Sequence, residues 1–177
     1  AAAFADYLEE IRRAQALLGD RAVPIVLGPV TLLRLSRLEE PLEIVLARLL
    51  PAYIELLEAL RALGVPEVQL HEPALVLDDA PELQTAYEVA VAALAETGLP
   101  LNLVTYFDDL GETYEWVLDL PVDVLTLDFT RGETLARVNG TPWPEDSVLA
   151  AGVIDGRNVW RMRGEETLAR LQQLADQ

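Results

Sequence analysis

Short apolar runs alternate with longer segments of helical periodicity along the whole chain, and this alternation limits the possible folds more than any other feature. Five runs are expected to form strands: 23–27, 67–70, 101–106, 122–127 and 148–154. Helical periodicity predicts helices at 4–18, 41–63, 81–98, 109–118, 133–138 and 165–174. Pro51 is expected to kink or divide the second helix. Strands that alternate with helices pair in parallel through right-handed crossovers, so the sequence predicts an α/β fold of about five β/α units.

The pattern of strands and helices leaves two architectures open. One is an open, doubly wound sheet of flavodoxin-like size. The other is a partial (β/α)8 barrel of the TIM type, because a complete barrel usually takes ~250 residues and this chain has 177. No linker or low-complexity segment interrupts the sequence, so residues 1–177 are expected to form a single α/β domain. The chain begins with Ala rather than Met, so it is expected to be processed, tagged or cut from a longer protein. Its length favours a fragment of a larger barrel domain.

Composition and charge exclude several classes of function. The formal net charge is −17, and an acidic surface repels phosphate backbones, so nucleic acid is not an expected partner. No apolar run approaches the ~18 residues of a membrane helix and no signal-peptide core is visible, which predicts a cytoplasmic protein without a membrane partner. All thirteen basic residues are Arg, which excludes Schiff-base chemistry by Lys. The absence of Cys excludes disulfides, zinc–thiolate sites and thiol nucleophiles.

Polar side chains follow every expected strand at the point where it ends. Because the carboxyl ends of parallel strands meet at one rim, and α/β folds bind ligands there, we expect a ligand-binding rim. Its candidate residues are Thr31, His71, Glu72, Tyr106, Asp108, Asp128, Arg131, Asp155 and Arg157. The pattern indicates a binding site but does not identify a ligand or a catalytic residue.

Several rim residues also have structural interpretations. A single His at a strand end, such as His71, is more often a hydrogen-bonded structural residue than a catalytic one. Glu72 is equally consistent with a partly buried carboxylate that is neutralised by Arg131 or Arg157. The segment 155–158 has the composition of a tight turn.

Three further alternatives concern the same region of the chain. Asp128 and Arg131 are three residues apart, so they suit a helix cap or a local salt bridge. A Mg²⁺ site built from carboxylates alone would take its ligands from four strand ends, namely Glu72, Asp108, Asp128 and Asp155. Trp143 and Trp160 are expected to be packing anchors rather than platforms for stacking.

Five segments, one for each expected strand, resemble motifs of a known enzyme family in the same order. They read PIVLGPVT (24–31), VQLHEPAL (68–75), TYFDDLG (105–111), LDFTRG (127–132) and GVIDGRNVW (152–160). They are similar to segments of cobalamin-independent methionine synthase, and the third and fifth resemble its N-terminal barrel. The departures are His71, which stands where the family has Asp, the absence of Lys, and the absence of segments for the remaining barrel strands.

The resemblance implies a part in methyl transfer from 5-methyltetrahydrofolate to homocysteine. It places the zinc in a C-terminal barrel that this chain lacks, so no metal and no cofactor is expected here. It also implies that this half packs against the catalytic barrel and helps to hold the polyglutamate tail of methylfolate. The arginines available for that tail are Arg34, Arg37, Arg131 and Arg157.

Two other functions remain open from the sequence. One is a stand-alone, non-catalytic binding or assembly module of the same fold. The other is a different barrel enzyme that uses Glu72, Asp128, Arg131 and Asp155 on a small anionic substrate. A partial barrel has two open sheet edges, so its expected partners are the remainder of the barrel, a second barrel domain or another chain.

Overall fold

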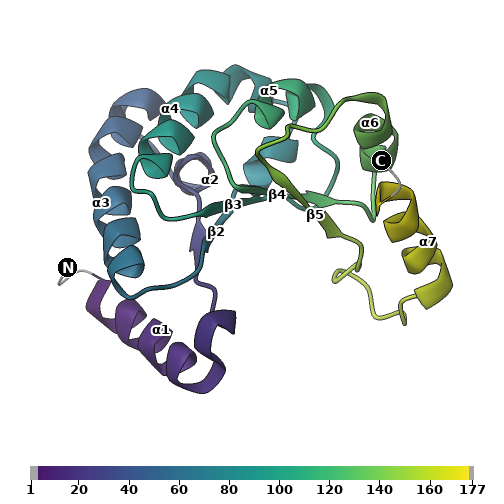
Figure 1. The fold of residues 1–177 in the computed structure, drawn as a ribbon. Helices are drawn as coiled ribbons and strands as arrows, with labels where there is room; N and C mark the ends of the chain where they lie inside the picture. The colour runs from purple at the N-terminus through teal and green to yellow at the C-terminus, as the bar shows by residue number, and fades with distance from the viewer. Residues whose placement is uncertain (1–3, 176–177) are drawn as a thin grey trace.

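The computed structural model describes residues 4–175 and has a sheet of five parallel strands at its centre (Figure 1). The strands are β1 (Ile25–Leu27), β2 (Val68–His71), β3 (Leu101–Val104), β4 (Val124–Asp128) and β5 (Val148–Gly152). They lie side by side in the order β1-β2-β3-β4-β5, without any reversal. A doubly wound sheet reverses its order at a switch point. The doubly wound alternative is therefore wrong, and the fold is an α/β sheet of the partial TIM-barrel type.

Helices follow the strands in the expected alternation. Their bounds are α1 (Ala5–Leu18), α2 (Pro29–Arg34), α3 (Leu42–Ala62), α4 (Gln84–Ala95), α5 (Tyr114–Leu118), α6 (Thr134–Gly140) and α7 (Gly164–Ala175). Figure 1 shows α3, α4 and α5 along the outside of the curved sheet, with α1 and α7 towards its two ends.

Two helices differ from the sequence-based expectation. α3 continues without interruption past Pro51, so the helix is not divided there, and a kink stays a prediction. The sequence analysis missed α2, because six residues are too few to show a helical period. Its start has a recognisable signal nonetheless, since Pro29 occupies the first helical turn, where proline is favoured.

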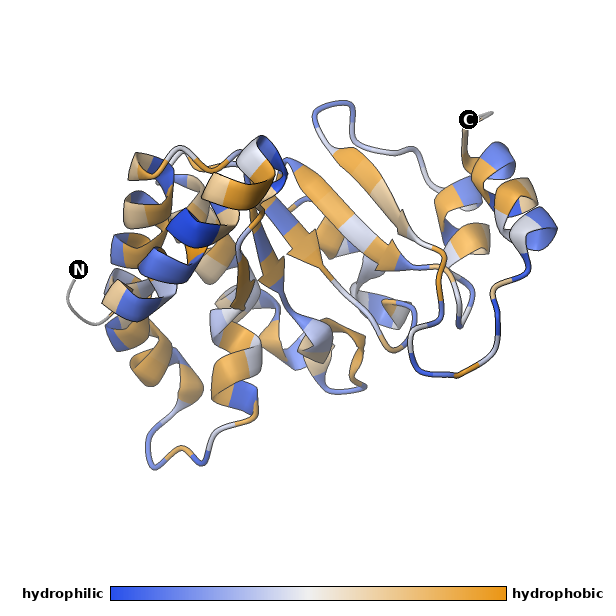
Figure 2. Ribbon diagram, turned by 90° about the horizontal axis from the view of Figure 1, so that it is seen from below, coloured by the Kyte–Doolittle hydropathy of each residue, from blue (hydrophilic) through white to orange (hydrophobic). Residues whose placement is uncertain are grey.

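The sheet buries one face against the helices. The buried strand residues on this face belong to one core cluster with Leu57, Leu60 and Leu94, and they are Val68, Leu70, Leu101, Leu103, Leu125 and Leu127. Alternate side chains of a strand point to the opposite face. That face carries Gln69, His71, Asn102, Val104, Thr126 and Asp128. In the view from below, no helix lies in front of the strands at the centre of the molecule (Figure 2).

The strands at the two edges of the sheet are β1 and β5, as expected for a partial barrel. Two tyrosine hydroxyls cover the β1 edge: Tyr7 donates to the carbonyl of Ile25 at 2.8 Å, and Tyr53 donates to that of Leu27 at 2.7 Å. Burial, with a smaller contribution from the charge of Glu72, raises the pKa of Tyr53 to about 12. These bonds satisfy carbonyl groups that an edge strand leaves without a strand partner.

None of the helices within residues 4–175 combines the length and apolarity that crossing a bilayer requires.

Candidate ligand-binding rim

Glu72 lies at the carboxyl end of β2, and its carboxylate is buried. It accepts hydrogen bonds from the backbone N–H groups of Val30, at 3.1 Å, and Thr31, at 2.8 Å. These two groups belong to the first turn of α2, where the helix itself provides no acceptor. The expected pairing of Glu72 with Arg131 or Arg157 is wrong, because the partners of this carboxylate are backbone amides.

The electrostatic state of Glu72 is set by two opposing effects. Burial raises the pKa of Glu72 to about 7, although the hydrogen bonds from Thr31 and Val30 favour the charged form and lower it. The hydroxyl of Tyr87 lies nearby, buried and without a hydrogen bond of good geometry to any described residue. Burial raises the pKa of Tyr87 strongly, and the charge of Glu72 raises it further. Burial therefore favours the neutral form of both groups.

Thr31 and Gly28 complete this buried cluster. The Thr31 side chain is buried, and its hydroxyl oxygen accepts a hydrogen bond from the backbone N–H of Ala74 at 3.1 Å. A Cβ atom on Gly28 would overlap the carboxylate of Glu72, so only glycine allows this close approach. The segments 24–31 and 68–75 are thus direct contact partners, and the buried side chains of Thr31 and Glu72 are structural parts of the rim.

His71 is half-buried beside the aromatic side chains at the end of β3. Its ring meets that of Tyr106 edge-on, with the centroids 5.4 Å apart, and burial lowers the pKa of His71. Nε2 lies 3.5 Å from the side-chain oxygen of Gln69, at the limit for a hydrogen bond. The imidazole of His71, whose neutral form is favoured by burial, is on the open face of the sheet beside Gln69.

Asp128 fixes the backbone of two neighbouring loops. One carboxylate oxygen accepts from the N–H and the hydroxyl of Thr130, at 2.7 and 2.6 Å, and the other accepts from the N–H of Phe107 at 3.2 Å. Phe107 has a φ angle of 92°, which is rare for a residue with a side chain. Asp128 does not cap the following helix, because α6 begins without a side-chain cap bond. The alternative of a local salt bridge with Arg131 is also wrong, since Arg131 lies near Asp155 instead.

The segment 155–158 forms the tight turn that its composition predicts. The Asp155 carboxylate accepts from the N–H of Arg157 at 2.9 Å and from the side chain of Asn158 at 2.7 Å, and these bonds lower the pKa of Asp155. Arg131 lies 3.6 Å from the same carboxylate. The guanidinium of Arg157 stacks over Phe107, with its central carbon 5.0 Å from the ring centroid.

These contacts gather part of the predicted rim around one hollow. A cavity of about 370 Å³ at the ends of β3, β4 and β5 is lined by Tyr106, Phe107, Asp128, Asp155 and Arg157, together with apolar groups. Asp108 does not take part, since it is exposed and lines a separate hollow of about 450 Å³ with the loop after β2. Thr31 and Glu72 are buried beside the rim rather than open to a ligand.

Two functional candidates were missed by the sequence analysis. Phe107 supplies an exposed aromatic face beside Arg157, and Asp109 joins two loops by accepting the N–H groups of Gly111, at 2.8 Å, and Glu133, at 2.6 Å. Both residues lie in the segment 105–111, and that motif was the available signal for them.

The described residues do not supply a metal centre. No three His, Asp or Glu side chains within residues 4–175 are grouped in a way that could hold an ion. The oxygens of Glu72, Asp128 and Asp155 are already used by backbone N–H groups and neighbouring side chains. Among the described residues, the alternative of a carboxylate-only Mg²⁺ site therefore has no supporting cluster.

Removing the Asp128 carboxylate should loosen the rim. The variant Asp128→Ala loses the acceptor for three donor groups, so we expect a decrease of about 2 kcal/mol in unfolding free energy and faster amide exchange at Phe107. Urea unfolding and hydrogen exchange would measure the two effects. The control is Asp108→Ala, which removes an exposed carboxylate with one local hydrogen bond; equal effects for both variants would contradict this role of Asp128.

Comparison with known proteins identifies the family of this chain. The profile of the family described as "Cobalamin-independent synthase, N-terminal domain" matches residues 1–177. The chain belongs to this family. The family assignment confirms the resemblance that the five segments indicated, and it makes the rim described above a rim of this synthase domain.

The relatives of this synthase domain are much longer proteins. The chain is 54% identical over 169 residues to a protein of Thermosynechococcus vestitus named 5-methyltetrahydropteroyltriglutamate–homocysteine methyltransferase. It is 50% identical over 172 residues to the protein of that name in Trichodesmium erythraeum, and 39% identical over 166 residues to that of Bacillus subtilis. These matches cover 96%, 97% and 91% of the chain, but only 22%, 23% and 22% of the relatives. The chain therefore spans about a fifth of the length of the relatives that it matches.

Proposed function

We propose that this chain is the non-metal part of a methyltransferase that moves the methyl group of 5-methyltetrahydropteroyltriglutamate to homocysteine. The family assignment is the observation that carries the proposal, because it covers all 177 residues. In this proposal zinc belongs to the remainder of the longer protein, where it would bind the homocysteine thiolate. The residues of this chain bind and orient the donor, and the remainder of the barrel and the catalytic barrel are its partners. Cytoplasmic localisation stays a prediction.

The tail of the donor is the part of the substrate that the rim suits best. A triglutamate is a flexible chain of carboxylates, and Arg side chains bind carboxylates through paired, charge-assisted hydrogen bonds. Arg157 lines the hollow, and Arg131 lies 3.6 Å from the carboxylate of Asp155, which also lines it. Arg34 is less suitable, because its guanidinium already pairs with Asp79. Of the four arginines that the sequence suggested, only Arg157 lines this hollow, so Arg157 is the first candidate for tail binding and its neighbour Arg131 is the second.

A chimera with the methyltransferase of Thermosynechococcus vestitus would test the proposed function. The 169 matched residues of the Thermosynechococcus vestitus methyltransferase are replaced by residues 1–177 of this chain. We expect the chimera to transfer the methyl group to homocysteine, as measured by methionine formation. A folded but inactive chimera would contradict the proposal. If the isolated chain nonetheless bound the triglutamate donor in a thermal-shift assay, that result would favour the stand-alone binding module.

If Arg157 binds the tail of the donor, changing it in the same chimera should affect KM for the donor. Arg157→Ala removes charge-assisted hydrogen bonds to the tail, so KM for the triglutamate donor should rise about tenfold with little change in kcat. KM for the monoglutamate donor should stay nearly constant. Arg12→Ala, a change of the same kind on the exposed face of α1, is the matched control. Equal changes for both donors would show that Arg157 does not recognise the tail.

A further inference from the structure

The loop after β5 exposes two large apolar side chains that are adjacent in the sequence. Val159 is 93% exposed and Trp160 is 81% exposed. The expectation that Trp160 is a packing anchor is therefore wrong within this structure, whereas Trp143 is partly buried and donates its ring N–H to the carbonyl of Ser147 at 2.8 Å. Adjacent exposed apolar residues of this size are typical of a contact surface.

The loop that carries Trp160 is held in a defined shape. Asp155 accepts from the backbone of Arg157 and the side chain of Asn158, and the side chain of Asn158 in turn accepts from the N–H of Trp160 at 2.8 Å. Arg157 is stacked on Phe107. A loop that is ordered before binding loses less conformational entropy when it meets a partner.

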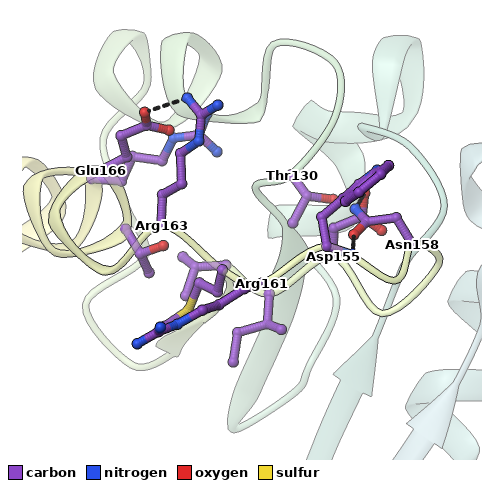
Figure 3. A pocket seen from close by; sticks show the side chains of 12 residues that line it. Thr130, Asp155, Asn158, Arg161, Arg163 and Glu166 are labelled. Atoms are coloured by element: carbon purple, nitrogen blue, oxygen red, sulfur yellow. Dashed lines mark hydrogen bonds and ion pairs between the residues drawn. The ribbon is translucent and has the colours of Figure 1, made fainter.

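The charge of this loop is opposite to that of the chain. Residues 153–163 contain three arginines and one acidic residue, while the whole chain has a formal net charge of −17. Figure 3 shows the hollow beside the loop, with the Arg163–Glu166 ion pair on one side and the Asp155–Asn158 hydrogen bond on the other. Arg161 also lines this hollow, and no ion pair of Arg161 is found among the described residues. An apolar centre with a basic border is complementary to an apolar pocket with an acidic border.

We propose that Val159 and Trp160 are the anchor of an interface with another folded part of the same polypeptide, which presents an apolar pocket bordered by Asp and Glu. This inference rests on the proposed function, in which the chain works within a longer methyltransferase. The relatives support that choice of partner, because the chain covers only 22–23% of their length. Large aromatic residues at the centre of an interface account for a disproportionate share of its binding energy.

Hydroxyl-radical footprinting of the isolated chain and of the chimera described above would test the inference. Trp160 should be modified readily in the isolated chain and protected in the chimera. Leu17 of α1 is 84% exposed, lies outside the proposed interface, and is the internal control. Trp160→Ala should lower the thermal midpoint of the chimera by about 2 °C and leave that of the isolated chain nearly constant. Leu17→Ala should change neither protein.

The outcomes separate this inference from the proposed function. An active chimera in which Trp160 remains as reactive as in the isolated chain would overturn the interface and leave the function intact. A folded, inactive chimera with Trp160 protected would overturn only the function. Protection of Trp160 in the isolated chain at high concentration would show that a second copy is the partner, which would also overturn the inference. A chimera that does not fold would count against both.

Discussion

The variant Gly28→Ala should lose about 3 kcal/mol of unfolding free energy or more, which corresponds to roughly 6–12 °C in thermal midpoint for a chain of this size. The added methyl group would overlap the carboxylate of Glu72. That carboxylate cannot move away without giving up the N–H groups of Val30 and Thr31, which would then be buried without an acceptor. Thermal and urea unfolding followed by circular dichroism would measure the loss.

Two further variants would establish the cause of that loss. Gly140→Ala is the matched control, because no heavy atom lies within 4 Å of the added methyl group, and its effect should be near zero. In a double-mutant cycle, Gly28→Ala should cost much less when Glu72 is already alanine, because the overlap is then removed. An equal cost in the presence and absence of the Glu72 side chain would place the strain elsewhere.

The sequence was sufficient to predict which segments form strands, that these strands are parallel, and where the rim lies. Alternating apolar runs and helical periods imply parallel strands, and parallel strands bring their carboxyl ends together. For this reason Tyr106, Asp128, Asp155 and Arg157 do meet around one hollow. The choice between a doubly wound sheet and a barrel could not be made from periodicity, because both have the same alternation and differ only in the spatial order of the strands.

The role of Glu72 could not be predicted from the sequence. A buried carboxylate was expected to have an Arg partner, but its actual partners are backbone amides of α2, a helix too short to be recognised by its period. The sequence also could not distinguish Asp108 from Asp128. Each comes at the end of a strand, but only Asp128 lines the shared hollow. The position of a residue after a strand predicts the rim to which it belongs, whereas the direction of its side chain depends on loop conformation.

Replacing Glu72 with Gln should remove most of one pH-dependent contribution to stability. Burial raises the pKa of Glu72 from 4.5 to about 7 in the folded chain. Between these values the folded chain holds a proton that the unfolded chain has released. The unfolding free energy therefore falls as pH rises through this window, by about 3 kcal/mol in total, and the contribution is fully present only below pH 4.5. Gln is neutral throughout, so its contribution does not change with pH.

The measurable quantity is the difference in unfolding free energy between Glu72→Gln and the unmodified chain, determined by urea unfolding from about pH 5 to about pH 8. Gln offers one oxygen to the two N–H groups of α2, so it should cost stability at the acidic end. As pH rises, the difference should shift in favour of Gln by up to about 3 kcal/mol, because only Glu must then be buried as an anion. The exposed Glu58, changed to Gln on α3, removes the same charge and should show no such shift. A pH-independent difference for Glu72→Gln would mean that the two amide hydrogen bonds outweigh burial and keep this carboxylate ionised across the whole range.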